Sequence, residues 1–117
     1  MERPVAEEAG AGLATPEPIR IRAKTRGEAT EVRVLMPHPM ESGFRRDQAG
    51  GAYPAHYITS VRVVAEDRLV LEATLSPAVS QDPLLFFRFR GGKPGERVRV
   101  VWTDNKGLQK AGEAVIT

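Results

Sequence analysis

Two β-strands and the turn between them can be read from residues 84–103, LLFFRFRGGKPGERVRVVWT. Large apolar side chains occupy every second position on each side of the turn, at Leu85, Phe87 and Phe89 and then at Val98, Val100 and Trp102. Successive side chains of a strand point to opposite faces, so alternate residues share one face. The glycines and the proline between the two halves suit a turn. We therefore predict two strands that bury Trp102 and a cluster of phenylalanines in a common core.

The same alternation continues on both sides of this pair. It predicts further strands at residues 19–24, 30–36, 57–65, 68–75 and 109–116. Short turns join several of them, at residues 26–28, 66–67 and 104–107. Seven short strands without a helical window favour an all-β fold, an antiparallel β-sandwich of the immunoglobulin or fibronectin kind. A small barrel is the alternative.

Length and composition indicate one domain with one core. The chain has 117 residues, of which 41% are hydrophobic, and no apolar run is long enough to span a bilayer. Residues 1–18 are rich in Ala, Gly, Glu and Pro, which predicts a disordered tail before a domain at residues 19–117. This tail holds four acidic groups and one basic group, although the whole chain has a net charge of +2. The first residues lack the basic and then apolar pattern of a secretory signal.

The absence of cysteine restricts the chemistry of the chain. It excludes disulfides, thiolate metal sites and covalent chemistry through a thiol of its own. Hydrolytic catalysis would need a nucleophile beside a base, and the nearest hydroxyl to His38 is that of Ser42. No nucleophile-elbow or phosphate-loop sequence surrounds them, so we expect Ser42 to satisfy a turn amide and the protein not to be an enzyme.

One long connection, residues 36–56, follows neither the helical nor the strand period. Pro37 and Pro39 interrupt it, and non-repetitive segments of this length in a small domain are more often functional than idle. Met36, His38 and Met40 alternate there, and two thioethers with an imidazole are donors that suit copper(I). No second cluster completes a coordination shell. The simpler interpretation is that the methionines close one end of the sandwich while His38 bonds to loop backbone.

A surplus of apolar residues lies at positions that alternation assigns to solvent. These residues are Leu35, Ile58, Val64, Val70, Phe86 and Val101. One explanation is that another subunit covers a sheet from outside. The other is that loops bury these strands on both sides, or that the alternation slips; the pattern alone favours neither. Aromatic residues make up only 6% of the chain and are not interleaved with a basic stripe, so we do not expect nucleic-acid binding.

Several segments taken together resemble one known family. They are residues 37–43 (PHPMESG), 54–58 (PAHYI), 77–80 (PAVS), 87–89 (FRF) and 102–107 (WTDNKG). In order and spacing they look like SoxZ, the non-catalytic subunit of the SoxYZ carrier complex in bacterial thiosulfate oxidation. The resemblance covers about residues 19–117. It implies an immunoglobulin-like sandwich that forms a heterodimer with a SoxY-like subunit, whose flexible carboxyl-terminal arm bears the cysteine that carries sulfur.

The resemblance also implies a place and a set of contacts. We expect a periplasmic protein, exported together with a partner that bears the signal, and transient contacts with other Sox enzymes but none with membrane. No cofactor is expected, and the isolated chain is expected to be able to form a homodimer. The expected partner interface comprises Leu35, Met36, His38, Met40, Phe44, Arg45, Arg46, Ile58, Val64, Val70, Phe86 and Val101.

Two alternatives stay open at this stage. Arg45 and Arg46 are expected to attract anionic sulfur adducts or an acidic partner, unless they are simply solvated loop residues. The competing function is a self-contained small-molecule or copper-binding sandwich, with a site formed by the loops of His38 and His56.

Overall fold

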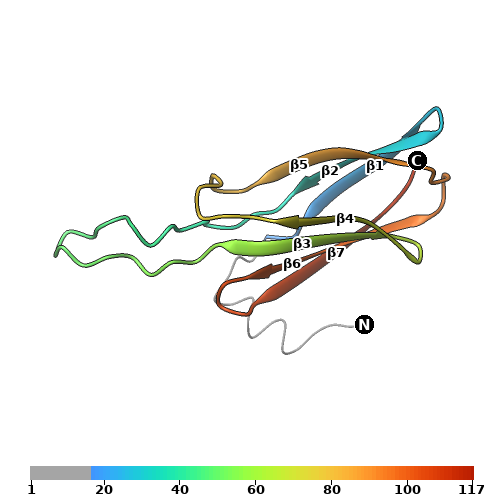
Figure 1. Ribbon diagram of the computed structural model, residues 1–117. Helices are drawn as coiled ribbons and strands as arrows, with labels where there is room; N and C mark the ends of the chain where they lie inside the picture. The colour runs from blue at the N-terminus through green and yellow to red at the C-terminus, as the bar shows by residue number, and fades with distance from the viewer. Residues whose placement is uncertain (1–16) are drawn as a thin grey trace.

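The computed structural model describes residues 17–117, which form two antiparallel sheets packed face to face (Figure 1). One sheet has the order β1-β2-β5 and consists of β1 (Arg20–Arg26), β2 (Ala29–Leu35) and β5 (Leu84–Arg90). The other has the order β4-β3-β6-β7 and consists of β3 (Ile58–Ala65), β4 (Arg68–Thr74), β6 (Arg97–Asp104) and β7 (Gln109–Val115). The predicted β-sandwich is confirmed. The predicted disordered tail lies outside the described residues, except for its last two.

Each of the seven predicted strands is present, with ends that differ by one or two residues. The described residues form no helix, and so none that is long and apolar enough to cross a membrane. Three hairpins connect neighbouring strands: β1 with β2, β3 with β4, and β6 with β7. Longer connections join the two sheets, from β2 to β3, from β4 to β5 and from β5 to β6.

The core lies between the sheets and is made largely of the side chains that alternation predicts to point inward. Val32, Val34, Val61, Val63, Val98, Val100 and Trp102 are fully buried. Burying one such aliphatic side chain contributes about 1.5–3 kcal/mol, so this layer provides much of the driving force for folding. Phe89 is buried with them, whereas Leu85 and Phe87 are half-buried at the edge of the core.

Two irregularities in strand pairing correct the predicted faces. Ile58, predicted on an outer face, is fully buried: the pairing of β3 with β6 shifts between Ile58 and Ser60, and the inserted residue turns Ile58 inward. The pairing of β3 with β4 shifts in the same way, between Val63 and Val64. As a result Leu69 is 45% exposed and does not share the inner face with Leu71, contrary to the prediction from alternation.

The connection between β2 and β3 projects from one end of the sandwich as a long irregular hairpin, which we call the arm (residues 36–57; Figure 1). Isolated antiparallel bridges hold its two sides together, Glu41 with His56 and Arg46 with Ala52. The base of the arm is buried in the end of the sandwich, and its far half is exposed. The arm therefore combines a fixed root with an accessible tip.

Candidate functional site

The buried root of the arm holds a cluster of His38, His56 and Asp104. Oδ2 of Asp104, the last residue of β6, lies 3.2 Å from Nε2 of His38 and 2.8 Å from Nε2 of His56. The two imidazole rings meet edge to face with their centroids 4.6 Å apart. The ring of His38 also meets the indole of Trp102 edge to face at 5.0 Å. The cluster thus joins the arm to the centre of the core.

Backbone contacts determine the orientation and the tautomer of His38. Its main-chain N–H donates to Oδ1 of Asp82, and its carbonyl accepts the N–H of Asp82, both at 3.0 Å. Its Nδ1 accepts the N–H of Met40 at 3.0 Å, so Nδ1 has no proton in the neutral ring. Nε2 therefore carries the proton and donates it to Asp104.

The carboxylate of Asp104 is fully satisfied by hydrogen bonds. While Oδ2 accepts from the two histidines, Oδ1 accepts the N–H of Lys106 at 3.0 Å and that of Leu108 at 2.9 Å. Asp104 therefore also closes the turn between β6 and β7. Burial alone would raise its pKa, but the hydrogen bonds from His38, Leu108, His56 and Lys106 outweigh that effect and hold the pKa below its ordinary value.

Burial in the same cluster lowers the pKa of His38 below 6.5. Desolvation is the largest cause, and the nearby imidazole of His56 acts in the same direction, whereas the hydrogen bond to Asp104 opposes both. A neutral His38 is the form that the Met40 N–H requires, because a protonated ring could not accept that bond. The geometry and the direction of the pKa shift therefore agree.

The three side chains also offer a ligand set for a metal, since one donor atom of each lies within 4.8 Å of the others. Two imidazoles and a carboxylate suit several divalent metals. However, binding a metal at Nε2 of His38 would move its proton to Nδ1, opposite the N–H of Met40. The described hydrogen bonds give every polar side-chain atom of His38 and Asp104 a partner without a metal, and they give His56 a partner at Nε2. In the predicted soft Met-His-Met set, Nδ1 of His38 accepts the N–H of Met40 and Sδ of Met40 accepts the N–H of Ile58, so these two donor atoms already hold hydrogen bonds.

The predicted interface residues separate into three groups. Met36, His38, Met40 and Ile58 are buried. The half-buried residues are Leu35, Val64, Val70 and Val101. The exposed ones are Phe44, Arg45, Arg46 and Phe86. The surplus apolar side chains belong to both sheets: Leu35 and Phe86 lie in β1-β2-β5, and Ile58, Val64, Val70 and Val101 lie in β4-β3-β6-β7.

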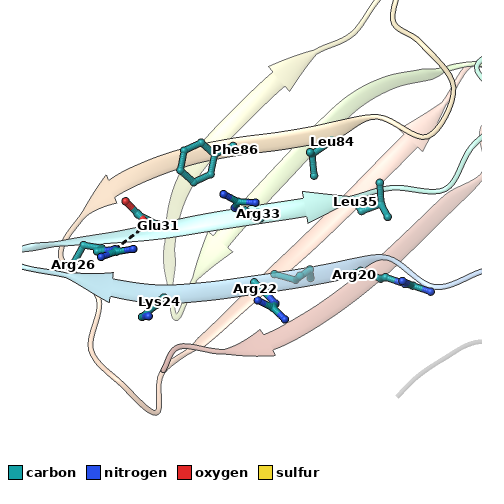
Figure 2. Close-up of a pocket in the computed structure, with 10 residues that line it drawn as sticks. Arg20, Arg22, Lys24, Arg26, Glu31, Arg33, Leu35, Leu84 and Phe86 are labelled. Atoms are coloured by element: carbon teal, nitrogen blue, oxygen red, sulfur yellow. Dashed lines mark hydrogen bonds and ion pairs between the residues drawn. The ribbon is translucent and has the colours of Figure 1, made fainter.

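The largest exposed apolar side chains of the sheets gather on the outer face of β1-β2-β5. Leu84 is 62% exposed and Phe86 is 55% exposed, and strand pairing places Leu35 directly opposite Leu84. We call Leu35, Leu84 and Phe86 the apolar corner. A groove of about 640 Å³ runs from it across the sheet, and Figure 2 shows its basic lining along β1. Sequence analysis identified Leu35 and Phe86 but missed Leu84 and the groove.

The tip of the arm presents a second exposed surface. Phe44 is 85% exposed, and the N–H of Phe44 donates to Oγ of Ser42, which confirms that this hydroxyl satisfies a turn amide. Arg45 pairs with both carboxylate oxygens of Glu41, at 2.8 and 3.2 Å, and lies over the ring of Tyr53 at 3.9 Å. Arg46 donates to the carbonyl of Gly50. Both arginines are therefore held in place by the arm itself.

Comparison with known proteins agrees with this architecture. A family model described as sulphur oxidation protein SoxZ matches residues 19–115. The chain belongs to the SoxZ family. It is thus a sulfur-oxidation protein, and the resemblance seen in the sequence is confirmed. A search of curated proteins found no match to this SoxZ-family chain.

Solved structures similar to this SoxZ-family chain share its fold at low identity. The superoxide reductase (neelaredoxin) of Ignicoccus hospitalis is 17% identical, with a TM-score of 0.63 over 96% of this chain and 88% of that one. A superoxide reductase in the oxidized state is 15% identical, with a TM-score of 0.61 over 86% and 87%. The hypothetical protein PH1083 of Pyrococcus horikoshii is 16% identical, with a TM-score of 0.59 over 86% and 87%. At these identities the likeness shows the sandwich alone.

Proposed function

We propose that this SoxZ-family chain is the non-catalytic subunit of a sulfur-carrier complex in thiosulfate oxidation. It would form a heterodimer with a SoxY-like subunit and hold that subunit in place while sulfur is carried on the partner's cysteine. Membership of the family supports the pathway. The absence of cysteine supports the division of labour, because covalent sulfur carriage needs a thiolate that this chain does not have. We propose the periplasm as its compartment, as the family resemblance implies.

The exposed apolar corner is the observation that carries the proposal of a partner. Leu84 and Phe86 leave more than half of their side chains in water, although a monomer gains nothing from exposing a leucine and a phenylalanine side by side. Adjacent, well-exposed aromatic and aliphatic residues are typical anchors of protein–protein interfaces. We therefore place the main contact with the SoxY-like subunit at this corner.

The arm is proposed to dock the enzymes that act on the carried sulfur. Its rigid root supports a tip with an exposed phenylalanine, Phe44, beside the Arg45–Tyr53 stack. Such a tip offers an aromatic anchor and positive charge on an element that projects away from the sandwich. The two arginines would favour acidic partners or the anionic sulfur adducts.

The competing function, a metal-binding sandwich, has one observation in its favour, the His38–His56–Asp104 cluster. The hydrogen bond from Met40 to Nδ1 of His38 argues against it, as does the complete set of partners around Asp104. The likeness to superoxide reductases does not add to it, because that likeness concerns the fold. We therefore favour the carrier-subunit function.

Co-expression with a cysteine-bearing SoxY-like subunit of the same organism tests the proposal. We expect a complex with one copy of each chain by size-exclusion chromatography with light scattering. The L84Q/F86Q variant should weaken the complex about tenfold or more, since two anchor side chains are lost. L69Q/V115Q is the matched control: Leu69 and Val115 are 45% and 49% exposed on the outer face of the other sheet. Equal loss in both variants, or no complex with the wild-type chain, would refute the proposed interface.

A further inference from the structure

The groove beside the apolar corner concentrates positive charge. Its lining holds five basic side chains, Arg20, Arg22, Lys24 and Arg26 of β1 and Arg33 of β2, but only one carboxylate, that of Glu31. The whole chain has a net charge of only +2, so these cations are gathered here rather than spread evenly. Figure 2 shows the basic side chains of β1 following the strand on one face of the sheet.

Most of these cations have no counter-charge within the domain. Glu31 pairs with Arg26 and with Arg88, each at 3.2 Å. Arg20, Arg22, Lys24 and Arg33 form no ion pair with any other residue in the range 17–117. The guanidinium of Arg33 lies instead over the ring of Phe86, with 5.0 Å between its Cζ and the ring centroid. The groove therefore joins unneutralised charge directly to the apolar corner.

This clustering of like charges lowers the stability of the isolated domain. Strand pairing places Arg22 directly opposite Arg33, and like charges at directly opposite positions of an antiparallel pair are destabilising. The outer face of the other sheet is different, since Arg62 pairs with Glu72, and both Arg97 and Arg99 pair with Glu113. The outer face of one sheet thus pairs its cations with carboxylates, whereas the outer face of the other leaves them unpaired. This contrast points to a ligand that supplies the negative charge.

We propose that this groove binds an extended acidic segment of a partner protein. Alternate residues of β1 place Arg20, Arg22 and Lys24 about 6.7 Å apart, which is also the spacing of alternate side chains on an extended peptide. Carboxylates at every second residue of such a segment match this row one to one. An apolar residue at the end of the segment next to Arg20 would lie beside Leu35, which pairs with Arg20 on one side and with Leu84 of the apolar corner on the other. Lipid or nucleic acid would match the charge but not the combination of spacing and apolar corner.

The inference rests on the proposed function only in taking this outer face to be a protein-binding face, and it does not require the partner to be the SoxY-like subunit. Failure of the proposed interface at the apolar corner and failure of the present inference can be told apart. Loss of the complex in L84Q/F86Q tests the apolar corner, whereas the experiment below tests the basic row with a synthetic ligand and needs no SoxY-like subunit.

Fluorescence anisotropy of the full chain with a labelled peptide tests the proposal. The probe carries glutamate at alternate positions followed by leucine and phenylalanine; one control probe has glutamine in place of glutamate, and another has the glutamates in one block. We expect the alternating probe to bind best, and its affinity to fall about tenfold between roughly 20 and 300 mM NaCl as the charges are screened. The R22Q/R33Q variant should bind it about tenfold more weakly.

R62Q/R99Q is the matched control, because it removes two exposed arginines from the outer face of the other sheet. We expect it to bind the probe as the wild-type chain does. A structural readout separates binding from folding: R22Q/R33Q should unfold at a temperature no lower than the wild-type chain, because it relieves the Arg22–Arg33 repulsion.

Four results would overturn the proposal. The first is that the glutamine probe binds as tightly as the alternating glutamate probe. The second is an equal loss of affinity in R22Q/R33Q and R62Q/R99Q. The third is that phosphatidylglycerol vesicles or duplex DNA bind more tightly than the peptide and that R22Q/R33Q abolishes this vesicle or DNA binding. The fourth is a gain of tenfold or more in probe affinity when Glu2, Glu7 and Glu8 are replaced by glutamine, which would make the chain's own acidic amino-terminal segment the occupant.

Discussion

Replacing Asp104 with asparagine should lower the free energy of unfolding by removing the hydrogen-bond acceptor shared by the two histidines of the arm root. The asparagine oxygen would still accept the N–H groups of Lys106 and Leu108, but its amide would face Nε2–H of His38 and His56. His38 cannot respond by moving its proton, because its Nδ1 accepts the N–H of Met40. A buried donor therefore loses its partner.

The expected loss follows from the groups involved. A hydrogen bond to a charged group contributes about 1.5–3 kcal/mol, and an unsatisfied buried donor costs about 1–3 kcal/mol. These two figures overlap because both describe the one bond that His38 loses. Since His56 can reorient at its more accessible edge, we count His38 alone and expect D104N to lower the free energy of unfolding by about 2–4 kcal/mol, less than the sum of the two figures. With a urea m-value of about 1.5 kcal/mol/M, the midpoint would fall by about 1.3–2.7 M.

Urea titration at pH 7, followed by tryptophan fluorescence, measures this loss directly. Trp102 is the only tryptophan, it is fully buried, and its ring touches His38, so its emission reports on the cluster. D67N is the control, because Asp67 is exposed in the turn between β3 and β4. The H38Q/D104N double mutant should show a coupling of about 1–3 kcal/mol. A D104N variant within about 0.5 kcal/mol of the wild-type chain would refute the view that this network holds the arm root.

Three further predictions follow from the same contacts. Folding lowers the pKa of His38, so the unfolded chain takes up a proton at this residue first as the pH falls below about 6.5. The stability that depends on the neutral ring is therefore present above that pH and is lost as the pH falls through the folded pKa of His38. Asp104 adds a further loss of stability once the pH falls through the folded pKa of its carboxyl group. Urea titrations between pH 7.5 and 5 should show a slope of at most about 1.4 kcal/mol per pH unit from this one histidine, and an unchanged slope in H38Q would contradict its assignment. G92A should lower the free energy of unfolding by about 3 kcal/mol or more, because φ of Gly92 is +87° and the new Cβ would collide with the Thr30 hydroxyl. G95A should lower it by only about 1 kcal/mol, because Gly95 has a φ of +97° but lies in open space. Equal losses in the two variants by thermal denaturation would show that backbone strain alone decides. Equilibrium dialysis should find no stoichiometric copper or zinc, because metal binding would oppose the Met40 bond to His38, and one equivalent of metal that is lost in H38Q would restore the metal-binding alternative.

Much of the fold can be predicted from local pattern, and the two errors share one cause, a bulge in the pairing of two strands. Alternation identified the seven strands and the inward side chains of β2, β5 and β6, since the side-chain period of a strand depends on neighbouring residues alone. It failed at Ile58 and at Leu69, because one extra residue in a paired strand reverses every face beyond it. A bulge arises from pairing with another strand, so no pattern within the strand reveals it.

The candidate site shows the same division. His38 could be singled out from composition, and a functional role of the arm was predicted on the same ground, since two prolines, two methionines and an imidazole in a non-repetitive segment are unusual. Asp104 could not be linked to them. It lies 66 residues from His38 and 48 from His56, and its only local signal was its place in the predicted turn at residues 104–107, where its Oδ1 accepts the N–H groups of Lys106 and Leu108.

By itself the sequence determined the class of fold, the order of the strands along the chain, the exclusion of thiol chemistry and the resemblance to SoxZ. Only the tertiary structure decided which residues meet: it joined two histidines to one carboxylate and set the cations of β1 beside Arg33 and Phe86. The physical reason is range. Strand periodicity and composition act between neighbours in the chain, whereas hydrogen bonds across the core and charge on a sheet face depend on how distant strands pair.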